Sequence, residues 1–86
     1  MPSISRFQGI AISMYFDDHR PPHFHARAAG RQARVRIDNL QILTSDLTRK
    51  QLALVKTWAA VHQIELEENW RRARNDETLM QIRPLS

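Results

Sequence analysis

Residues 23–38 alternate between apolar and polar side chains with a period of two, and the dipeptide Ala29-Gly30 interrupts this alternation. A period of two is typical of β-strands, whose successive side chains point to opposite faces of a sheet. If Ala29-Gly30 forms a two-residue hairpin turn, the flanking strands can pair in one register. The predicted pairs are Phe24 with Val35, Ala26 with Ala33, His23 with Arg36 and His25 with Arg34. A slip by one residue would place arginines against the apolar face, so the alternation specifies the pairing.

Further patterns predict strands on either side of this hairpin. Residues 10–17 alternate in the same way, and the loop of residues 17–22 ends that strand because its consecutive prolines cannot donate hydrogen bonds to a sheet. Asp38-Asn39 is a turn signal, and a short strand at about Gln41 to Leu43 follows it. Near the end of the chain, residues 80–82 predict a final short strand.

A helical pattern occupies the C-terminal half. Thr48 and Gln51 predict a capping box at its start, and neither glycine nor proline interrupts residues 49–75. The apolar stripe, spaced mostly by three and four residues, comprises Leu54, Val55, Trp58, Val61, His62, Leu66, Trp70 and Ala73. An uninterrupted helix would extend about 40 Å, longer than a domain of this size is wide. It either bends near His62-Gln63 or overhangs the sheet, and we predict one long C-terminal helix, straight or kinked.

These patterns predict a single small α+β domain over residues 1–86. An antiparallel sheet of about four to five short strands carries the long helix on one face. The chain has no cysteine, which excludes disulfide scaffolds, thiolate nucleophiles and cysteine-ligated zinc. Its two glycines cannot build a glycine-rich phosphate loop. Its apolar runs are far shorter than the about 20 residues that span a bilayer, so we expect a cytoplasmic protein without a secretory signal.

Positive charge is concentrated in the N-terminal half of the chain. The formal net charge is +4, and residues 1–36 hold six arginines against two aspartates. Guanidinium groups suit phosphates, carboxylates and aromatic faces, and clustered basic charge is typical of proteins with a polyanionic partner. The simpler alternative is a solvated surface with a chance excess of arginine.

The polar face of the predicted sheet combines arginines with aromatic and imidazole rings. Sheets that bind single-stranded RNA or DNA have this arrangement, since arginines bind phosphates and rings stack on bases. The candidate nucleic-acid-binding residues are Tyr15, His23, His25, Arg27, Arg34 and Arg36. His23 and His25 are also candidate catalytic residues of a metal-independent ribonuclease, one taking a proton from a ribose 2′-hydroxyl and the other protonating the leaving oxygen. Histidines that only hydrogen-bond on a polar surface are the alternative.

Three histidines lie close together around the two consecutive prolines. His23 and His25 lie on one predicted face, about 7 Å apart along the strand. Such a pair can share a metal, with His19 or an aspartate of the preceding loop as third ligand. The facing residues, Arg34 and Arg36, would repel a divalent cation. We therefore predict no metal and no cofactor.

The predicted helix begins with two basic residues. Arg49 and Lys50 occupy its first turn, where the helix dipole disfavours cations. They are therefore candidate anion-binding residues, unless solvent simply screens a small penalty. Further along the stripe, His62 is interpreted as a histidine at the edge of the core, and Trp58 and Trp70 as core anchors.

The segment Pro21-Pro22-His23-Phe24-His25-Ala26 and the run from Met14 to His19 are the most distinctive in the chain. Further matching segments are Ile4-Ser5-Arg6-Phe7, Gly9-Ile10, Leu52-Ala53-Leu54-Val55, Trp58-Ala59, Glu68-Asn69-Trp70 and Ile82-Arg83-Pro84-Leu85. Together they resemble the bacterial family of domains of unknown function numbered 4160, over nearly the whole chain.

This resemblance implies a small bacterial protein, often encoded beside another small domain of unknown function, numbered 2442, in pairs that look like toxin–antitoxin modules. It assigns no catalytic residue. We therefore expect this protein to be the binding component of a two-gene module. It would dock a small partner protein and nucleic acid through the His/Arg face of its sheet. The alternatives are a toxin-like ribonuclease, and a structural or regulatory protein whose arginines bind an acidic partner without nucleic acid. The toxin or antitoxin role and the oligomeric state stay open.

Overall fold

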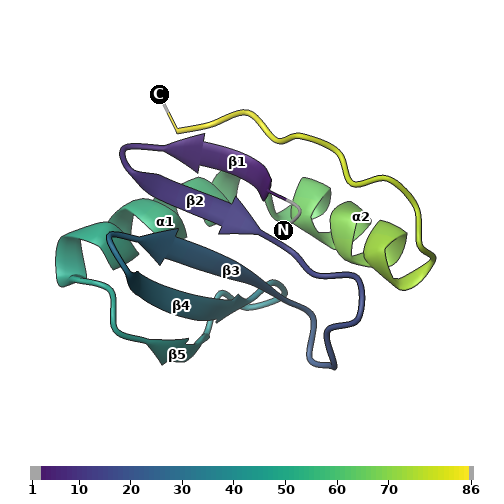
Figure 1. Cartoon of the computed structure of the whole chain (residues 1–86), viewed down its shortest axis with the longest axis horizontal. Helices are drawn as coiled ribbons and strands as arrows, with labels where there is room; N and C mark the ends of the chain where they lie inside the picture. Colours follow the sequence, from purple (N-terminus) through teal and green to yellow (C-terminus); the bar gives the residue numbers. More distant parts are fainter. Residues whose placement is uncertain (1–2, 86) are drawn as a thin grey trace.

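The computed structural model describes residues 3–85, which form a five-stranded antiparallel sheet followed by two helices (Figure 1). The strands are β1 (Ser3–Phe7), β2 (Ile10–Ser13), β3 (His23–Ala28), β4 (Arg31–Arg36) and β5 (Ile42–Ser45). The helices are α1 (Arg49–Val61) and α2 (Gln63–Arg74). The strands lie in the sheet in chain order, so each pairs with its neighbours in sequence. The class is α+β as predicted, whereas the predicted helical part is wrong.

The β3–β4 hairpin has the register that the alternation predicts. Its cross-strand pairs include His23–Arg36, Phe24–Val35, His25–Arg34 and Ala26–Ala33. Ala29 and Gly30 have φ values of 50° and 78°. Both values are in the left-handed region, as a two-residue turn of type I′ requires. Glycine adopts this conformation at no steric cost, whereas alanine does not.

Replacing Ala29 with asparagine is expected to stabilise the protein by about 0.5–1 kcal/mol. Alanine at positive φ brings its Cβ close to the following carbonyl oxygen, whereas asparagine tolerates this region and Asn-Gly is the preferred I′ pair. Thermal denaturation should show a rise in Tm of a few degrees. As a control, the same replacement at the exposed Ala60 of α1 should lower Tm, because asparagine is the poorer helix former. A lower Tm for Ala29→Asn would show that the turn does not impose this strain.

β2 is shorter than the alternation of residues 10–17 predicts. The strand ends at Ser13, although Met14 is still fully buried in the core. Beyond it the chain leaves the sheet and forms the loop that leads to β3, and Phe16 is 41% exposed. The alternation of buried and exposed side chains therefore ends where the chain leaves the sheet.

In the described part of the chain, residues 80–82 form no strand, contrary to the prediction. The segment after α2 returns beside β1 (Figure 1), and the Ile82 N–H donates to the carbonyl oxygen of Ile4 at 2.8 Å. One such hydrogen bond does not make a ladder. Ile82 is nevertheless 3% exposed, so the segment contributes an apolar side chain to the core.

The predicted single long C-terminal helix is wrong. α1 and α2 are separated at His62, whose backbone angles of φ −115° and ψ 24° are not helical. The His62 N–H donates to the carbonyl oxygen of Ala59 at 3.1 Å, a tighter turn than that of an α-helix. The Gln63 side-chain amide donates to the carbonyl oxygens of Ile37 and Asp38, at 2.8 and 3.1 Å. These bonds tie the break to the connection between β4 and β5.

The size of the sheet explains why the helix breaks. The longest dimension of the domain is 33 Å, so a straight helix of about 40 Å would extend beyond the sheet. The break lets each helix turn its apolar side toward the core, and Trp58 of α1, Leu66 and Trp70 of α2 are all buried. Burying these side chains outweighs the helical hydrogen bonds lost at the break. Neither helix within residues 3–85 is long and apolar enough to cross a bilayer.

The start of α1 confirms the predicted capping box. The Gln51 N–H donates to Thr48 Oγ1 at 3.1 Å, and the Thr48 N–H donates to Gln51 Oε1 at 2.9 Å. Leu47 and Leu52, which flank the cap, both pack against the edge of the core. This signal is local, which is why the sequence alone places the start of the helix.

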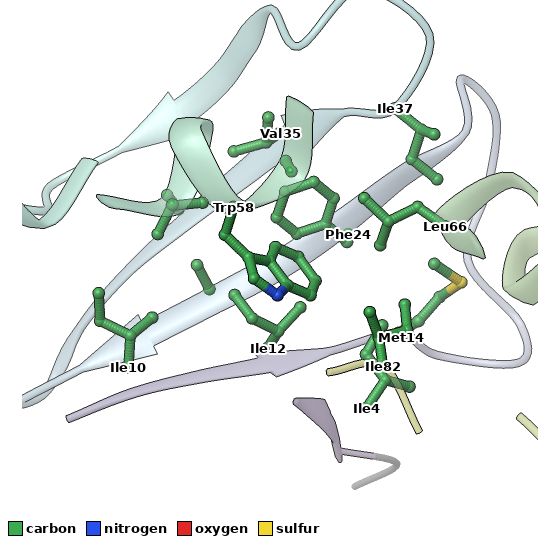
Figure 2. Packing of buried hydrophobic residues seen from close by; sticks show 14 of the residues in the cluster. Ile4, Ile10, Ile12, Met14, Phe24, Val35, Ile37, Trp58, Leu66 and Ile82 are labelled. Carbon is green, nitrogen blue, oxygen red and sulfur yellow. The ribbon is translucent and has the colours of Figure 1, made fainter. Parts of the chain in front are cut away.

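The core lies between the helices and one face of the sheet. Figure 2 shows Trp58 of α1 beside Phe24 of β3 and Ile12 of β2, with Leu66 of α2 close by. The Trp58 and Phe24 rings meet nearly edge to face, with centroids 5.9 Å apart. In the described chain the helices leave most of the opposite face of the sheet open (Figure 1). Exposed arginines of β1, β3 and β4 lie on that face, although some of its polar side chains are buried.

Candidate nucleic-acid interface and histidine cluster

The sheet face turned away from the helices, which we call the open face, carries rows of polar side chains from several strands. One row is Arg6, Ala11, Arg27 and Gln32, and the next is Ser13, His25, Arg34 and Thr44. A shorter row pairs His23 with Arg36. Arg6, Arg27 and Arg34 are exposed. Three guanidinium groups from three strands therefore share one solvent-facing surface.

Arg34 and Arg36 are oriented by polar partners. Arg36 donates two hydrogen bonds to the Asp38 carboxylate, at 2.6 and 3.0 Å. These bonds raise the pKa of the Arg36 guanidinium and lower the pKa of the Asp38 carboxyl group. Arg34 donates its Nε–H to Thr44 Oγ1 at 3.2 Å, so its side chain leans toward β5. Arg36 is therefore paired with a carboxylate. Arg34 is exposed and forms no ion pair with a carboxylate of residues 3–85.

Three side chains, those of Asp18, His23 and His25, form a cluster at the N-terminal end of β3. We call it the histidine cluster. His25 Nε2 lies 2.9 Å from Asp18 Oδ2, and His23 Nε2 lies 3.4 Å from the same oxygen. The two imidazole centroids are 5.2 Å apart. Partial burial lowers the pKa of His25, and its hydrogen bond to Asp18 opposes this shift. Tyr15 covers His25 edge-on, with ring centroids 4.5 Å apart.

His23 is buried rather than displayed on the open face. The residue is 3% exposed, and its ring lies 5.7 Å from that of Trp70 in α2. Its Nδ1 lies 2.7 Å from the carbonyl oxygen of Pro21. A carbonyl can only accept, so Nδ1 carries the proton. The alternation predicts the correct face of the strand for His23, but the preceding loop and α2 close over this end of β3.

The loop of residues 14–22 is fixed against α2. Arg74 donates its Nη1–H to the carbonyl oxygen of Asp18 at 2.7 Å, and its guanidinium lies 5.7 Å from the centre of the Trp70 ring. The contact joins residues 56 positions apart in the sequence. It places the Asp18 carboxylate at the histidines, which local sequence patterns do not reveal.

The histidine cluster meets the geometric requirement for a shared cation. Among the described residues, one ligand atom each from Asp18, His23 and His25 lie within 4.8 Å of one another. His19, the other histidine considered as a third ligand, is exposed and does not belong to this group. Two-histidine acid–base catalysis fits less well, because the protonated Nδ1 of His23 is bonded to the main chain and its Nε2 is buried.

The two basic residues at the start of α1 are displayed to solvent. Arg49 and Lys50 are exposed and occupy the first turn. The capping box already occupies the N–H groups of Thr48 and Gln51. Anion binding by Arg49 and Lys50 stays a prediction.

The residues interpreted as core anchors include Trp58 and Trp70, and both are buried. His62 lies at the edge of the core, where its Nδ1 is 2.6 Å from Glu65 Oε1. Beside it is a cavity of about 330 Å³, lined by Trp58, Val61, His62, Arg83, Pro84 and Leu85. Val61 and Ile64 are 73% and 82% exposed next to the helix break. The sequence stripe places Val61 in the core, and the break turns it outward.

Comparison with known proteins identifies a family. A family model described as a domain of unknown function (DUF4160) matches residues 9–71. This range includes β2, the histidine cluster and most of α2. Neither the curated proteins nor the solved structures give a match.

Proposed function

This chain belongs to the DUF4160 family, and we propose that it binds single-stranded nucleic acid on the open face of its sheet. In this proposal it is the small basic binding component of a bacterial two-gene, toxin–antitoxin-like module, and it also docks a small partner protein. The observation that carries the nucleic-acid part is the row arrangement of Arg6, Arg27 and Arg34 on three strands. All three side chains are exposed.

The spacing of these arginines suits a flexible strand of phosphates. Arg6 and Arg27 lie in one row on either side of Ala11, so their strands are about 10 Å apart. The alanine side chain between the two arginines is short. A phosphate backbone that crosses this row can therefore contact both guanidinium groups, and Arg34 on β4 continues the basic surface.

Rings at one end of the open face favour a single strand over a duplex. Tyr15 and His25 lie edge to face at this end, and both side chains are partly exposed. A base of a single strand can stack against such a ring, whereas a base inside a duplex cannot leave its stack without cost. The partner is therefore expected to be single-stranded RNA or DNA.

Fluorescence anisotropy with a labelled 12-nucleotide RNA, and with DNA of the same sequence, tests this proposal. If three arginines neutralise three phosphates, the affinity should fall about 20-fold between 50 and 200 mM salt. The double variant Arg27→Gln/Arg34→Gln should bind more weakly and retain about one third of the salt slope. The control Lys56→Gln/Arg83→Gln removes the same charge from α1 and the C-terminal segment, and it should retain the wild-type slope.

Other outcomes of this assay separate the alternatives. Equal losses in both double variants would show that only total charge matters, and the open face would not be the interface. No retention of either oligonucleotide would favour an acidic protein partner. Cleavage of the RNA by wild-type protein that is lost in His25→Ala would indicate the ribonuclease alternative instead.

A further inference from the structure

We propose that the histidine cluster binds one divalent first-row transition-metal ion, coordinated by His23 Nε2, His25 Nε2 and an Asp18 carboxylate oxygen. This site is separate from the arginines of the open face and does not depend on nucleic-acid binding. It reverses the expectation of a metal-free protein, on evidence that only the folded structure supplies.

The strongest observation is the state of His23. Its Nδ1–H donates to the Pro21 carbonyl oxygen at 2.7 Å, which leaves the lone pair on Nε2. This Nε2 atom is buried and has no hydrogen-bond partner among the described residues. A metal-bound histidine commonly donates its other ring N–H to a backbone carbonyl, which fixes the tautomer and the direction of the lone pair. His23 thus has the orientation of a ligand.

The distances within the cluster also fit a single ion. Two ligand atoms bound at about 2.1 Å to a tetrahedral ion lie about 3.4 Å apart. Asp18 Oδ2 lies 3.4 Å from His23 Nε2 and 2.9 Å from His25 Nε2. All three ligand atoms lie within 4.8 Å of one another, and rotation of the side chains brings them to one centre when the ion binds. On binding, the ion replaces the Nε2 proton that His25 now donates to Asp18, and His25 coordinates as the neutral Nδ1–H tautomer.

The arginines that were expected to repel a cation have polar partners outside the histidine cluster. Arg36 is neutralised by its two hydrogen bonds to Asp38. Arg34 leans toward Thr44 on β5. Arg74 bonds to the main-chain oxygen of Asp18, so the carboxylate of that residue stays with the histidines. Of the two facing arginines, Arg36 is therefore paired with a carboxylate, whereas the charge of Arg34 still acts on His25 and lowers its pKa.

The donor set defines the class of ion. Two imidazoles and one carboxylate suit Zn²⁺, Fe²⁺ and their first-row neighbours, and three protein ligands leave coordination positions for solvent or substrate. Trp70 lies against the His23 ring at 5.7 Å and Tyr15 against the His25 ring at 4.5 Å. These aromatic neighbours pack against the two imidazoles and restrict their rotation.

Titration of tag-free full-length protein with Co²⁺ tests the proposal. The readout is the visible absorbance of the bound ion, because Co²⁺ with a low coordination number has absorption bands in the visible range. We expect saturation at one ion per chain, and competition by Zn²⁺. His25→Ala and Asp18→Asn should each weaken binding by more than about 100-fold, a larger loss than removal of an outer-shell partner causes. The matched controls His19→Ala and His62→Ala remove histidines outside the cluster and should bind as the wild type does.

His23 needs a second measurement, because its buried side chain also supports the fold. In ¹⁵N NMR spectra of wild-type protein, His23 should be the Nδ1–H tautomer before metal is added. Zn²⁺ should then shift the Nε2 signals of His23 and His25 and leave His19 unchanged. The proposal is overturned by the absence of saturable binding, by equal binding in His25→Ala and the His19→Ala control, or by Zn²⁺ shifts that miss His23.

Discussion

Replacing Trp58 with alanine is expected to destabilise the protein by about 3–5 kcal/mol, the usual cost of removing a large aromatic side chain from a core. Trp58 is fully buried, and its ring contacts Phe7, Phe24 and His62 with centroids 5.4, 5.9 and 5.4 Å away. Its Nε1–H donates to the carbonyl oxygen of Arg83 at 2.9 Å. The substitution therefore leaves a cavity between sheet and helix and also removes the partner of that oxygen.

The effect is large for a chain of this size. Domains are commonly stable by only about 5–15 kcal/mol, so Trp58→Ala should lower Tm by at least about 15 °C. Chemical denaturation monitored by circular dichroism measures the change. Trp58→Phe keeps most of the ring and loses the hydrogen bond to Arg83, so it should lie between the wild type and the alanine variant. Ile64→Ala, at a side chain that is 82% exposed, should change stability by less than about 0.5 kcal/mol. Similar losses at Trp58 and Ile64 would contradict the packing described here.

Replacing Asn69 with alanine is expected to cost about 2–4 kcal/mol, because it leaves two polar groups without partners. Asn69 is fully buried in α2. Its Nδ2–H donates to the Met80 carbonyl oxygen at 2.9 Å, and its Oδ1 accepts from the Met80 N–H at 2.8 Å. This pair of bonds holds the segment after α2 against the domain. The loss should therefore be concentrated in that segment.

Hydrogen exchange and denaturation together distinguish this local effect from global loss. In Asn69→Ala, the amide of Ile82, which bonds to Ile4, should exchange faster relative to the amides of β3 and β4. The matched control is Asn75→Ala, since the exposed Asn75 side chain donates its Nδ2–H to the Arg71 carbonyl oxygen at the end of the same helix. It should change stability by less than about 0.5 kcal/mol. If Asn69→Ala behaves like Asn75→Ala, the buried amide does not anchor the segment.

The histidine cluster shows where sequence reasoning stops. The motif around Pro21-Pro22 identifies His23 and His25 as a candidate pair of metal ligands. The sequence offers His19 or an aspartate of the preceding loop as the third metal ligand. The choice between Asp18 and His19 depends on how that loop folds back. One contact that holds the loop is the hydrogen bond from Arg74 to the Asp18 carbonyl oxygen. No local pattern connects a residue in the loop with one at the end of α2.

The sequence by itself determined the β3–β4 register, the two-residue turn at Ala29-Gly30 and the capped start of α1. These features depend on residues adjacent in the chain, where a period of two, a left-handed turn and a capping box each have a local cause. Only the tertiary structure decided that the helical segment breaks at His62 rather than overhanging the sheet, that His23 is buried under α2, and that Asp18 reaches both histidines. These features depend on the area of the sheet that the helices cover and on contacts between segments that are distant in the sequence. Neither can be derived from a pattern of neighbouring residues.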